Sequence, residues 1–215
     1  MVLASGSPRR KELLSLLGVP FKAVRPAVGE MALPKEKPSQ QAVRLARMKA
    51  EAVASEEPAK IIVAADTLVV LSGQVMGKPA DKTQAWAMLK ALRGREHQVI
   101  SGIAVVAPSR RAIAVRSTET RVWMRDYSDD EIADYIARGE PFDKAGAYAI
   151  QDAVFNPVAR IEGCYTNVMG MPLCHLYVTH LELGFKLPVS PVQACGVLTG
   201  RKCLAASQIL EQASH

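Results

Sequence analysis

The chain has 215 residues, of which 49% are hydrophobic, so it can bury a substantial core in one domain or in two lobes. Its start turns polar directly after Val2-Leu3-Ala4, and no apolar run approaches the ~20 residues that cross a bilayer, so we expect a cytoplasmic protein with no membrane partner. The formal net charge of +6 suits a polyanion, but few aromatic residues and no long basic block disfavour nucleic acid.

Glycine, proline and capping residues divide the chain into predicted helices and strands. Apolar residues at helical spacing predict helices over residues 8–17, 39–54, 81–93, 128–139 and 172–184. Strand-like apolar runs occupy residues 2–4, 61–65, 68–71, 74–76, 97–107 and 112–124. Because helices alternate with strands while several strands follow one another as hairpins, we expect an α/β fold with a mixed sheet.

Some of these elements carry more specific expectations. Ser7 is expected to cap the first helix and Ser39 the second. Residues 185–215 are poorly patterned, so we expect a domain over residues 1–184 followed by a C-terminal tail of unknown role. The four cysteines show no Cys-x-x-Cys spacing and are expected to be reduced thiols rather than a zinc site.

The first turn of helix 8–17 concentrates positively charged side chains at the end where the helix dipole is already positive. Arg9, Arg10 and Lys11 in the first turn oppose the helix dipole by roughly 0.3–1 kcal/mol per charge, so a negative ligand would be stabilising there. With Ser7 and the amides of a glycine-containing turn, these cations form a candidate oxyanion site. A solvated basic helix start explains the segment equally well.

Two further charged residues stand in apolar surroundings. Asp66 follows five apolar residues, where strand 61–65 is expected to give way to a loop or hairpin. A carboxylate there could bind Mg²⁺, accept a proton from water or make a structural hydrogen bond. Lys49 falls within the apolar sector of its helix, so it needs an anion or must extend its ammonium group to water.

The loop over residues 143–151 is rich in small and polar residues. Lys144 offers a cation, and the Gln151 amide can both donate and accept hydrogen bonds at the edge of a base. The same residues would also suit an ordinary connecting loop. Lys78 and Glu30 are surface residues by default. The histidines show no spacing typical of a zinc site.

Taken together, these segments resemble the Maf family of nucleotide pyrophosphatases. The resemblance lies in six ordered blocks, which are Ser5-Gly6-Ser7-Pro8-Arg9-Arg10, Glu30, Ala46-Arg47-Met48-Lys49-Ala50, Ala65-Asp66-Thr67, Gly77-Lys78-Pro79 and Asp143-Lys144-Ala145-Gly146-Ala147-Tyr148. Gly94, His97 and residues 163–173 follow the same pattern, so the resemblance covers residues 2–183. Ala149 and Asp152 depart from it, since glycine is usual at both positions, and a stiffer loop is expected.

The resemblance implies an α/β fold with a long mixed sheet, flanking helices and two lobes around a central cleft, commonly in a homodimer. It also implies metal-dependent hydrolysis of a nucleoside triphosphate to the monophosphate and pyrophosphate. Asp66 matches the catalytic aspartate. Positions around the nucleotide, some associated with substrate choice, are matched by Ser7, Arg9, Arg10, Glu30, Lys49, Thr67, Lys78 and Gln151, and Lys144 adds a cation to the same loop.

In the expected mechanism the cations neutralise the triphosphate while water attacks the α-phosphorus. Asp66 and Glu30 are expected to hold a divalent metal ion, Mg²⁺ with Mn²⁺ as the alternative, and Asp66 is also the candidate proton acceptor. The run ending in Gln151 resembles the branch that acts on dTTP and UTP. A 7-methyl-GTP or other purine triphosphate pyrophosphatase is the alternative.

Two rival classes share part of this pattern. A nucleotide-binding regulator of cell division without turnover would use the same cations, but the intact pair of Asp66 and Glu30 favours catalysis. A nucleic-acid-binding module would account for the basic charge, and it predicts an affinity for DNA or RNA that falls steeply with salt.

Overall fold

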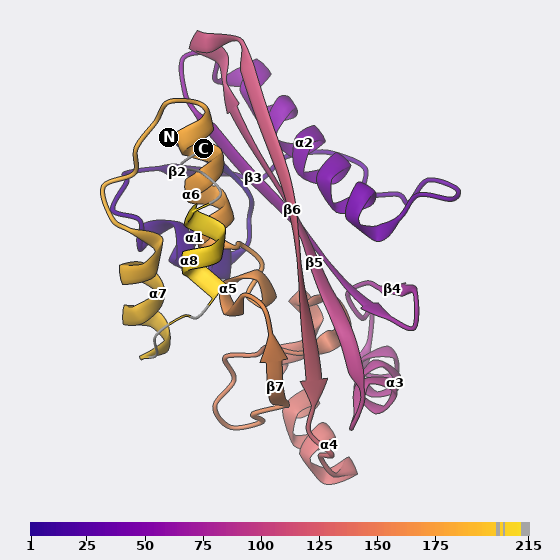
Figure 1. Cartoon of the computed structure of the whole chain (residues 1–215). Coiled ribbons are helices and arrows are strands. Elements are labelled where there is room, and N and C mark those ends of the chain that lie inside the picture. Colours follow the sequence, from indigo (N-terminus) through magenta and orange to yellow (C-terminus); the bar gives the residue numbers. More distant parts are fainter. Residues whose placement is uncertain (201–202, 204, 212–215) are drawn as a thin grey trace.

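The computed structural model describes residues 1–200, 203 and 205–211 of the chain (Figure 1). In this part of the chain the strands are β1 (Val2–Ala4), β2 (Lys22–Val24), β3 (Ile62–Leu71), β4 (Gln74–Met76), β5 (Glu96–Ala107), β6 (Ala112–Met124) and β7 (Val158–Glu162). They form one sheet in the order β2-β1-β3-β5-β6-β7, with β4 paired to β3. β1 runs parallel to β2 and β3, and the other pairings are antiparallel. The predicted α/β fold with a mixed sheet is confirmed.

The α-helices are α1 (Pro8–Ser15), α2 (Pro38–Glu56), α3 (Lys82–Leu92), α4 (Asp129–Ala137), α5 (Tyr165–Val168), α6 (Leu173–Glu182), α7 (Pro191–Thr199) and α8 (Ala205–Glu211). Short 3₁₀ turns are η1 (Pro108–Arg110), η2 (Glu140–Asp143) and η3 (Ala145–Ala147). In Figure 1, α2 lies along one side of the long strands, α1, α6 and α7 lie on the other, and α3 and α4 lie at the far end. The helices therefore flank the sheet, as predicted.

Alternating side chains of the central strands face two helical layers, as strand geometry requires. Leu3 and Val63 belong to a core cluster with α1 and α6, whereas Ile62 and Ala64 belong to a cluster with α2. A separate cluster at the other end of the long strands packs α3 and α4 against the sheet. The strands β3 and β5 extend through the clusters at both ends of the sheet, and these clusters correspond to the two expected lobes.

The prediction that Asp66 follows a strand was wrong. Asp66 lies within β3, a single strand of 10 residues that covers both predicted runs. The strand continues through Asp66 because β5 pairs with β3 without interruption from Ile62 to Val70. The hydrogen bonds of this ladder keep the polar residue in extended backbone within the core. The predicted strands 68–71 and 74–76 are confirmed as parts of a hairpin, with Ser72 and Gly73 at positive φ between them.

Several helix boundaries also differ from the predictions. Ser7 is the N-cap of α1, as expected, but α1 ends at Ser15 and a turn leads to Gly18. The N-cap of α2 is Lys37 rather than Ser39, because Pro38 takes the first helical position and the Gln40 side chain accepts a hydrogen bond from the Lys37 amide. The short elements β2, β7 and α5 were not predicted.

The C-terminal tail has more structure than its sequence pattern indicates. It forms α7 and α8, and its residues Leu187 and Ala194 belong to the same core cluster as Leu13 and Leu17 of α1 and the turn after it. The Val189 amide donates a hydrogen bond to the Leu17 carbonyl, which ties the tail to the end of the first helical segment. Among the described residues, no helix is long and apolar enough to cross a membrane.

Candidate active site

Two adjoining cavities lie between the core clusters at the two ends of the sheet. The first, here called the Lys49 cavity, has a volume of about 300 Å³ and includes the N-terminal loop, Glu30 and Lys49 in its wall. The second, the Gln151 cavity, is smaller, at about 110 Å³, and is bounded by α1, β3 and the loop after η2. Both are lined by Ser7, Arg10, Lys78 and Asp143, so they form one continuous cleft.

A buried ammonium group joins two carboxylates at the Lys49 cavity. The Lys49 Nζ atom lies 2.6 Å from Asp66 Oδ1 and 2.5 Å from Glu30 Oε1. Lys49 and Asp66 are only 7% and 6% exposed, and each charge would be costly there without the other. Lys49 therefore meets its anion on the apolar face of α2, and Asp66 lies behind it rather than in the cavity wall.

The close packing of α2 on the sheet places this pair. Asp66 is paired across the ladder with Gly102 of β5. A Cβ atom at Gly102 would lie 2.2 Å from the carbonyl oxygen of Ala42 on α2, so only glycine lets the helix come this near. Lys49 follows Ala42 by two helical turns on the same face, which brings its side chain over the neighbouring strand at Asp66.

The loop that carries Glu30 is held in place from α2. Arg44 Nη2 donates to the Met31 carbonyl at 3.0 Å, and the same guanidinium pairs with the Glu36 carboxylate. Partial burial alone would raise the pKa of Glu30. The hydrogen bond from Lys49 and the positive charges of Lys49, Lys78 and Arg10 outweigh burial and hold that pKa below its ordinary value. Glu30 is therefore an anion facing the cleft at neutral pH.

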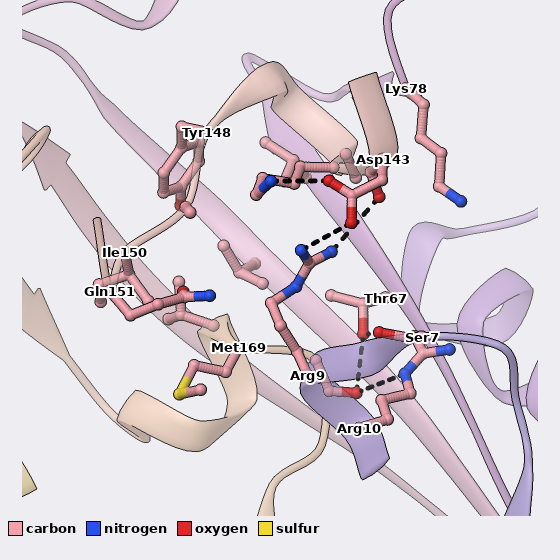
Figure 2. A pocket seen from close by; sticks show the side chains of 17 residues that line it. Ser7, Arg9, Arg10, Thr67, Lys78, Asp143, Tyr148, Ile150, Gln151 and Met169 are labelled. Atoms are coloured by element: carbon pink, nitrogen blue, oxygen red, sulfur yellow. Dashed lines mark hydrogen bonds and ion pairs between the residues drawn. The ribbon is translucent and has the colours of Figure 1, made fainter. Parts of the chain in front are cut away.

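Arg10 joins the N-terminal loop to the strands beneath it (Figure 2). Its Nε donates to the Gly170 carbonyl at 2.9 Å, its Nη1 to Ser5 Oγ at 3.3 Å and its Nη2 to Thr67 Oγ1 at 3.2 Å. Thr67 in turn lies 2.9 Å from the Ser101 hydroxyl on β5. Burial lowers the pKa of Arg10, and Asp66 and Glu30 partly offset this effect. The guanidinium is fixed in place while its charge faces the cleft.

The start of α1 leaves its positive end uncapped by a side chain. The Ser7 side chain makes no capping hydrogen bond, and the first turn contains no acidic residue. The Ser7 amide donates to Ser5 Oγ at 3.2 Å, which fixes the turn before the helix. The positive end of the helix and the adjacent Arg10 and Lys78 thus meet in the cleft without an acidic residue from this turn.

An ion pair spans the cleft between α1 and η2. Arg9 Nη1 lies 2.9 Å from Asp143 Oδ2, and its Nη2 donates to the Asp143 carbonyl at 3.3 Å (Figure 2). The Lys144 ammonium contacts the other Asp143 oxygen at 2.7 Å and also bonds to Glu140. Partial burial would raise the pKa of Asp143, but Lys144 and Arg9 lower it below its ordinary value. Lys144 lines the cavity while its charge is already engaged by acceptors.

The far wall of the Gln151 cavity combines an amide with apolar side chains. Gln151 points its amide group into the cavity from the loop after η3 (Figure 2). Val69, Val99 and Met169 contribute the apolar part of the wall. A flat ring with polar edges fits such a wall, because its face meets hydrocarbon and its edge meets the amide.

Except for Lys11, which is exposed and lines neither cavity, all candidate site residues singled out in the sequence are brought to this cleft. They are Ser7, Arg9, Arg10, Glu30, Lys49, Thr67, Lys78, Lys144 and Gln151 at the walls, and Asp66 directly behind Lys49. The sequence pattern missed Arg25, Ser101 and the role of Asp143 as the partner of Arg9. Asp143 begins a recognised block, but Arg25 and Ser101 carry no local signal, since only strand pairing and chain reversal bring them to the site.

The donor set suits a hard divalent cation. Asp66 and Glu30 place two carboxylates around the Lys49 ammonium group, and Mg²⁺ binds through one or two carboxylates, substrate phosphates and water. Within the described ranges, no group of three or more His, Cys, Asp or Glu side chains is placed to hold a metal ion. The residues therefore fit a site that is completed by the substrate.

The fold and the cleft define a mixed α/β protein whose cleft brings cations of the N-terminal loop beside two carboxylates. A family described as Maf-like protein matches residues 1–182, and the chain belongs to this Maf family. A relative from Thermomicrobium roseum is 48% identical over 192 residues, covering 88% of this chain and 86% of the relative. One from Geobacter sp. (strain M21) is 46% identical over 176 residues, covering 82% and 91%. Both relatives are named dTTP/UTP pyrophosphatase.

Proposed function

We propose that the chain is a nucleoside triphosphate pyrophosphatase that hydrolyses dTTP and UTP to the monophosphate and pyrophosphate. The observation that carries the proposal is the cluster in which buried Lys49 joins Asp66 and Glu30 beside the cations of the N-terminal loop. Relatives that are 46–48% identical to the chain over the aligned residues carry this activity in their names, which supports the choice of substrate.

The triphosphate is proposed to lie in the Lys49 cavity. Its oxygens would accept hydrogen bonds from the amides at the start of α1 and face Arg10 and Lys78. The base would enter the Gln151 cavity, where the Gln151 amide can both donate to and accept from a pyrimidine edge. Arg9 would exchange part of its pairing with Asp143 for the substrate.

Asp66 and Glu30 would hold a divalent metal ion, with Mg²⁺ as the first candidate and Mn²⁺ as the second. When bound, such an ion supplies Lewis acidity toward phosphoryl oxygens and lowers the pKa of bound water. Lys49 keeps the two carboxylates together before substrate arrives and can turn its ammonium toward a phosphate oxygen. Arg10 and Lys78 stabilise charge that develops on the phosphoryl group and on leaving pyrophosphate.

Asp66 is the proposed acceptor of the proton from the attacking water. It is held rigidly within the β3–β5 ladder, and a fixed acceptor needs little reorganisation during the reaction. Water attacks the α-phosphorus, the bond to the bridging oxygen breaks, and pyrophosphate leaves with the electron pair of that bond.

The reaction is tested by incubating the purified chain with Mg²⁺ or Mn²⁺ and a panel of triphosphates that includes dTTP, UTP, CTP, GTP and 7-methyl-GTP. We expect dTMP or UMP with pyrophosphate as products, and the highest kcat/KM for dTTP and UTP. Diphosphate plus phosphate as products would contradict the assigned bond, and a preference for 7-methyl-GTP would contradict the assigned base.

Asp66→Asn tests the catalytic role. The variant keeps the shape of the side chain, and we expect a loss of kcat of about 10²-fold or more, with circular dichroism showing a folded protein. Glu51→Gln on the exposed side of α2 is the matched control and should retain full activity. Parental pyrophosphate release by folded Asp66→Asn would remove Asp66 from the mechanism.

The assembly and compartment belong to the same proposal. We expect a homodimer in the cytoplasm, with residues 1–184 carrying the catalytic site. Light scattering of the purified chain measures the first property, and fractionation of expressing cells measures the second.

A further inference from the structure

All four cysteines of the chain line one pocket, away from the active-site cleft. Cys164 precedes α5, Cys174 lies in α6, Cys195 lies in α7, and Cys203 lies between α7 and α8. The pocket has a volume of about 450 Å³ and is closed on one side by the tail. Two of the thiols thus belong to the part of the chain that matches the family, and two belong to the tail beyond it.

The four thiols differ in access to solvent and in backbone constraint. Cys164, Cys174 and Cys195 are buried and reduced, whereas Cys203 is partly exposed. Cys174 and Cys195 are held within helices, while Cys164 is an N-cap residue with extended backbone. Cys203 is therefore the thiol that a soluble reagent can reach first, and Cys164 is the buried thiol whose backbone is not helical.

We propose that this pocket is a thiol oxidation site, in which Cys203 of the tail and Cys164 of the family domain form a disulfide on exposure to a small disulfide such as oxidised glutathione. The site joins the tail covalently to the segment that begins α5. It is separate from the cleft, and its formation does not depend on the proposed activity.

The reaction balances with glutathione disulfide as the oxidant. The Cys203 thiolate attacks one glutathione sulfur, the glutathione S–S bond breaks, and a mixed disulfide forms with release of one glutathione. The Cys164 thiolate then attacks the Cys203 sulfur and releases the second glutathione. Two protein thiols lose two electrons, and the two glutathione molecules take up the electrons and the two protons.

The surroundings of the buried thiols determine the pH at which exchange proceeds. Burial raises the pKa of Cys164, and the nearby Cys203 thiol raises it further, although the Thr166 hydroxyl at 3.2 Å opposes the shift. Burial likewise raises the pKa of Cys195 to about 11. Because the thiolate is the attacking species, the second step should accelerate as the pH rises above neutrality.

The position of Cys164 connects the pocket to the wall of the cleft. The Cys164 amide is held in place, since it donates a hydrogen bond to Thr120 Oγ1 at 3.0 Å. The helix α5 then leads from Cys164 to Gly170 within a few residues. The Gly170 carbonyl accepts hydrogen bonds from Arg10 and Thr67. A cross-link at Cys164 therefore acts on a segment that positions the N-terminal arginine, and its effect on catalysis rests on the proposed function.

Peptide mapping tests the proposal on the folded full-length chain. After incubation with oxidised glutathione and alkylation of free thiols, trypsin places Cys164 and Cys174 in residues 161–186, Cys195 in residues 187–201 and Cys203 in residues 203–215. We expect a peptide that joins 161–186 to 203–215, with fragmentation locating the bond at Cys164. A bond to Cys195 or Cys174, or no intramolecular disulfide, overturns the proposal.

Variants provide the controls. Cys203→Ser alters the partly exposed thiol and should abolish the cross-link in a folded protein, whereas Cys174→Ala and Cys195→Ala should retain it. In the oxidised chain we expect KM for dTTP to rise about threefold or more, reversed by dithiothreitol. A mapped cross-link in a chain without pyrophosphatase activity refutes only the proposed function, and an active chain without the cross-link refutes only this inference.

Discussion

Lys49 Nζ lies 2.6 Å from Asp66 Oδ1 although 17 residues separate the two in the chain, and both side chains are buried. The helix α2 supplies the cation and the strand β3 supplies the anion, so the pair fixes the helix to the sheet at the point where the cleft opens. The pairing explains why both positions carry charged residues, because burying either charge without the other would be costly here.

Lys49→Met should destabilise the chain by about 3–5 kcal/mol, since it leaves Asp66 buried without its cation. Urea unfolding measures the change. The double variant Lys49→Met with Asp66→Asn removes both charges and should recover part of this loss. A single variant as stable as the parent would show that water already solvates Asp66.

Gly102→Ala should cost about 3 kcal/mol, because the new methyl group would press against the Ala42 backbone of α2. We expect a lower urea midpoint and weaker nucleotide binding, since α2 carries Lys49. Gly196→Ala is the matched control. It lies in α7 with open space around it and should stabilise the chain slightly. Equal stability of the parent and Gly102→Ala would contradict the close packing.

His97 should make folding stability depend on pH. Burial lowers the pKa of His97 from 6.5 to about 4, so the unfolded chain takes up the proton first as the pH falls. Stability contributed by the neutral ring is complete above pH 6.5 and is lost progressively toward pH 4, with a loss of about 2 kcal/mol between pH 7 and pH 5.

His97→Asn isolates this group from the other titrating residues. The variant should lose less stability than the parent between pH 7 and pH 5, as measured by urea unfolding at each pH. It also removes the hydrogen bond between His97 Nε2 and the Tyr148 hydroxyl, so its stability at pH 7 should be lower. Parallel pH dependence in parent and variant would show that His97 does not contribute.

Gln151→Glu should lower kcat/KM for dTTP and UTP about tenfold or more, because it removes the donor from the amide while keeping its size. The loss should be smaller for a base that presents a donor at the same edge. Gln193→Glu, at an exposed position of α7 that lines neither cavity, is the control. Unchanged kinetics with every base would remove Gln151 from base recognition.

Local periodicity accounts for the elements and residues that were predicted correctly. The strand 112–124 and the helix over residues 128–139 were visible in the sequence because each depends on neighbours a few residues away. Lys49 was recognised as unusual on the same basis, since helical spacing alone places it among apolar residues.

Contacts between distant segments account for what was missed. Arg9 and Asp143 are 134 residues apart, and only the closed fold reveals their ion pair. The continuity of β3 through Asp66 depends on β5, and the helical tail depends on a core that its own sequence does not specify. The family resemblance singled out residues that lie at the cleft, but it left their pairing open.

The packing of the tail has a consequence for the cations at the start of α1. The helix that presents Arg9 and Arg10 to the cleft rests on leucines shared with Leu187 and Ala194, which lie beyond the family match. The family domain and the tail thus together set the orientation of one pair of guanidinium groups. In a chimaera that keeps residues 1–182, another tail must supply an apolar surface of the same shape to preserve the orientation of the two guanidinium groups.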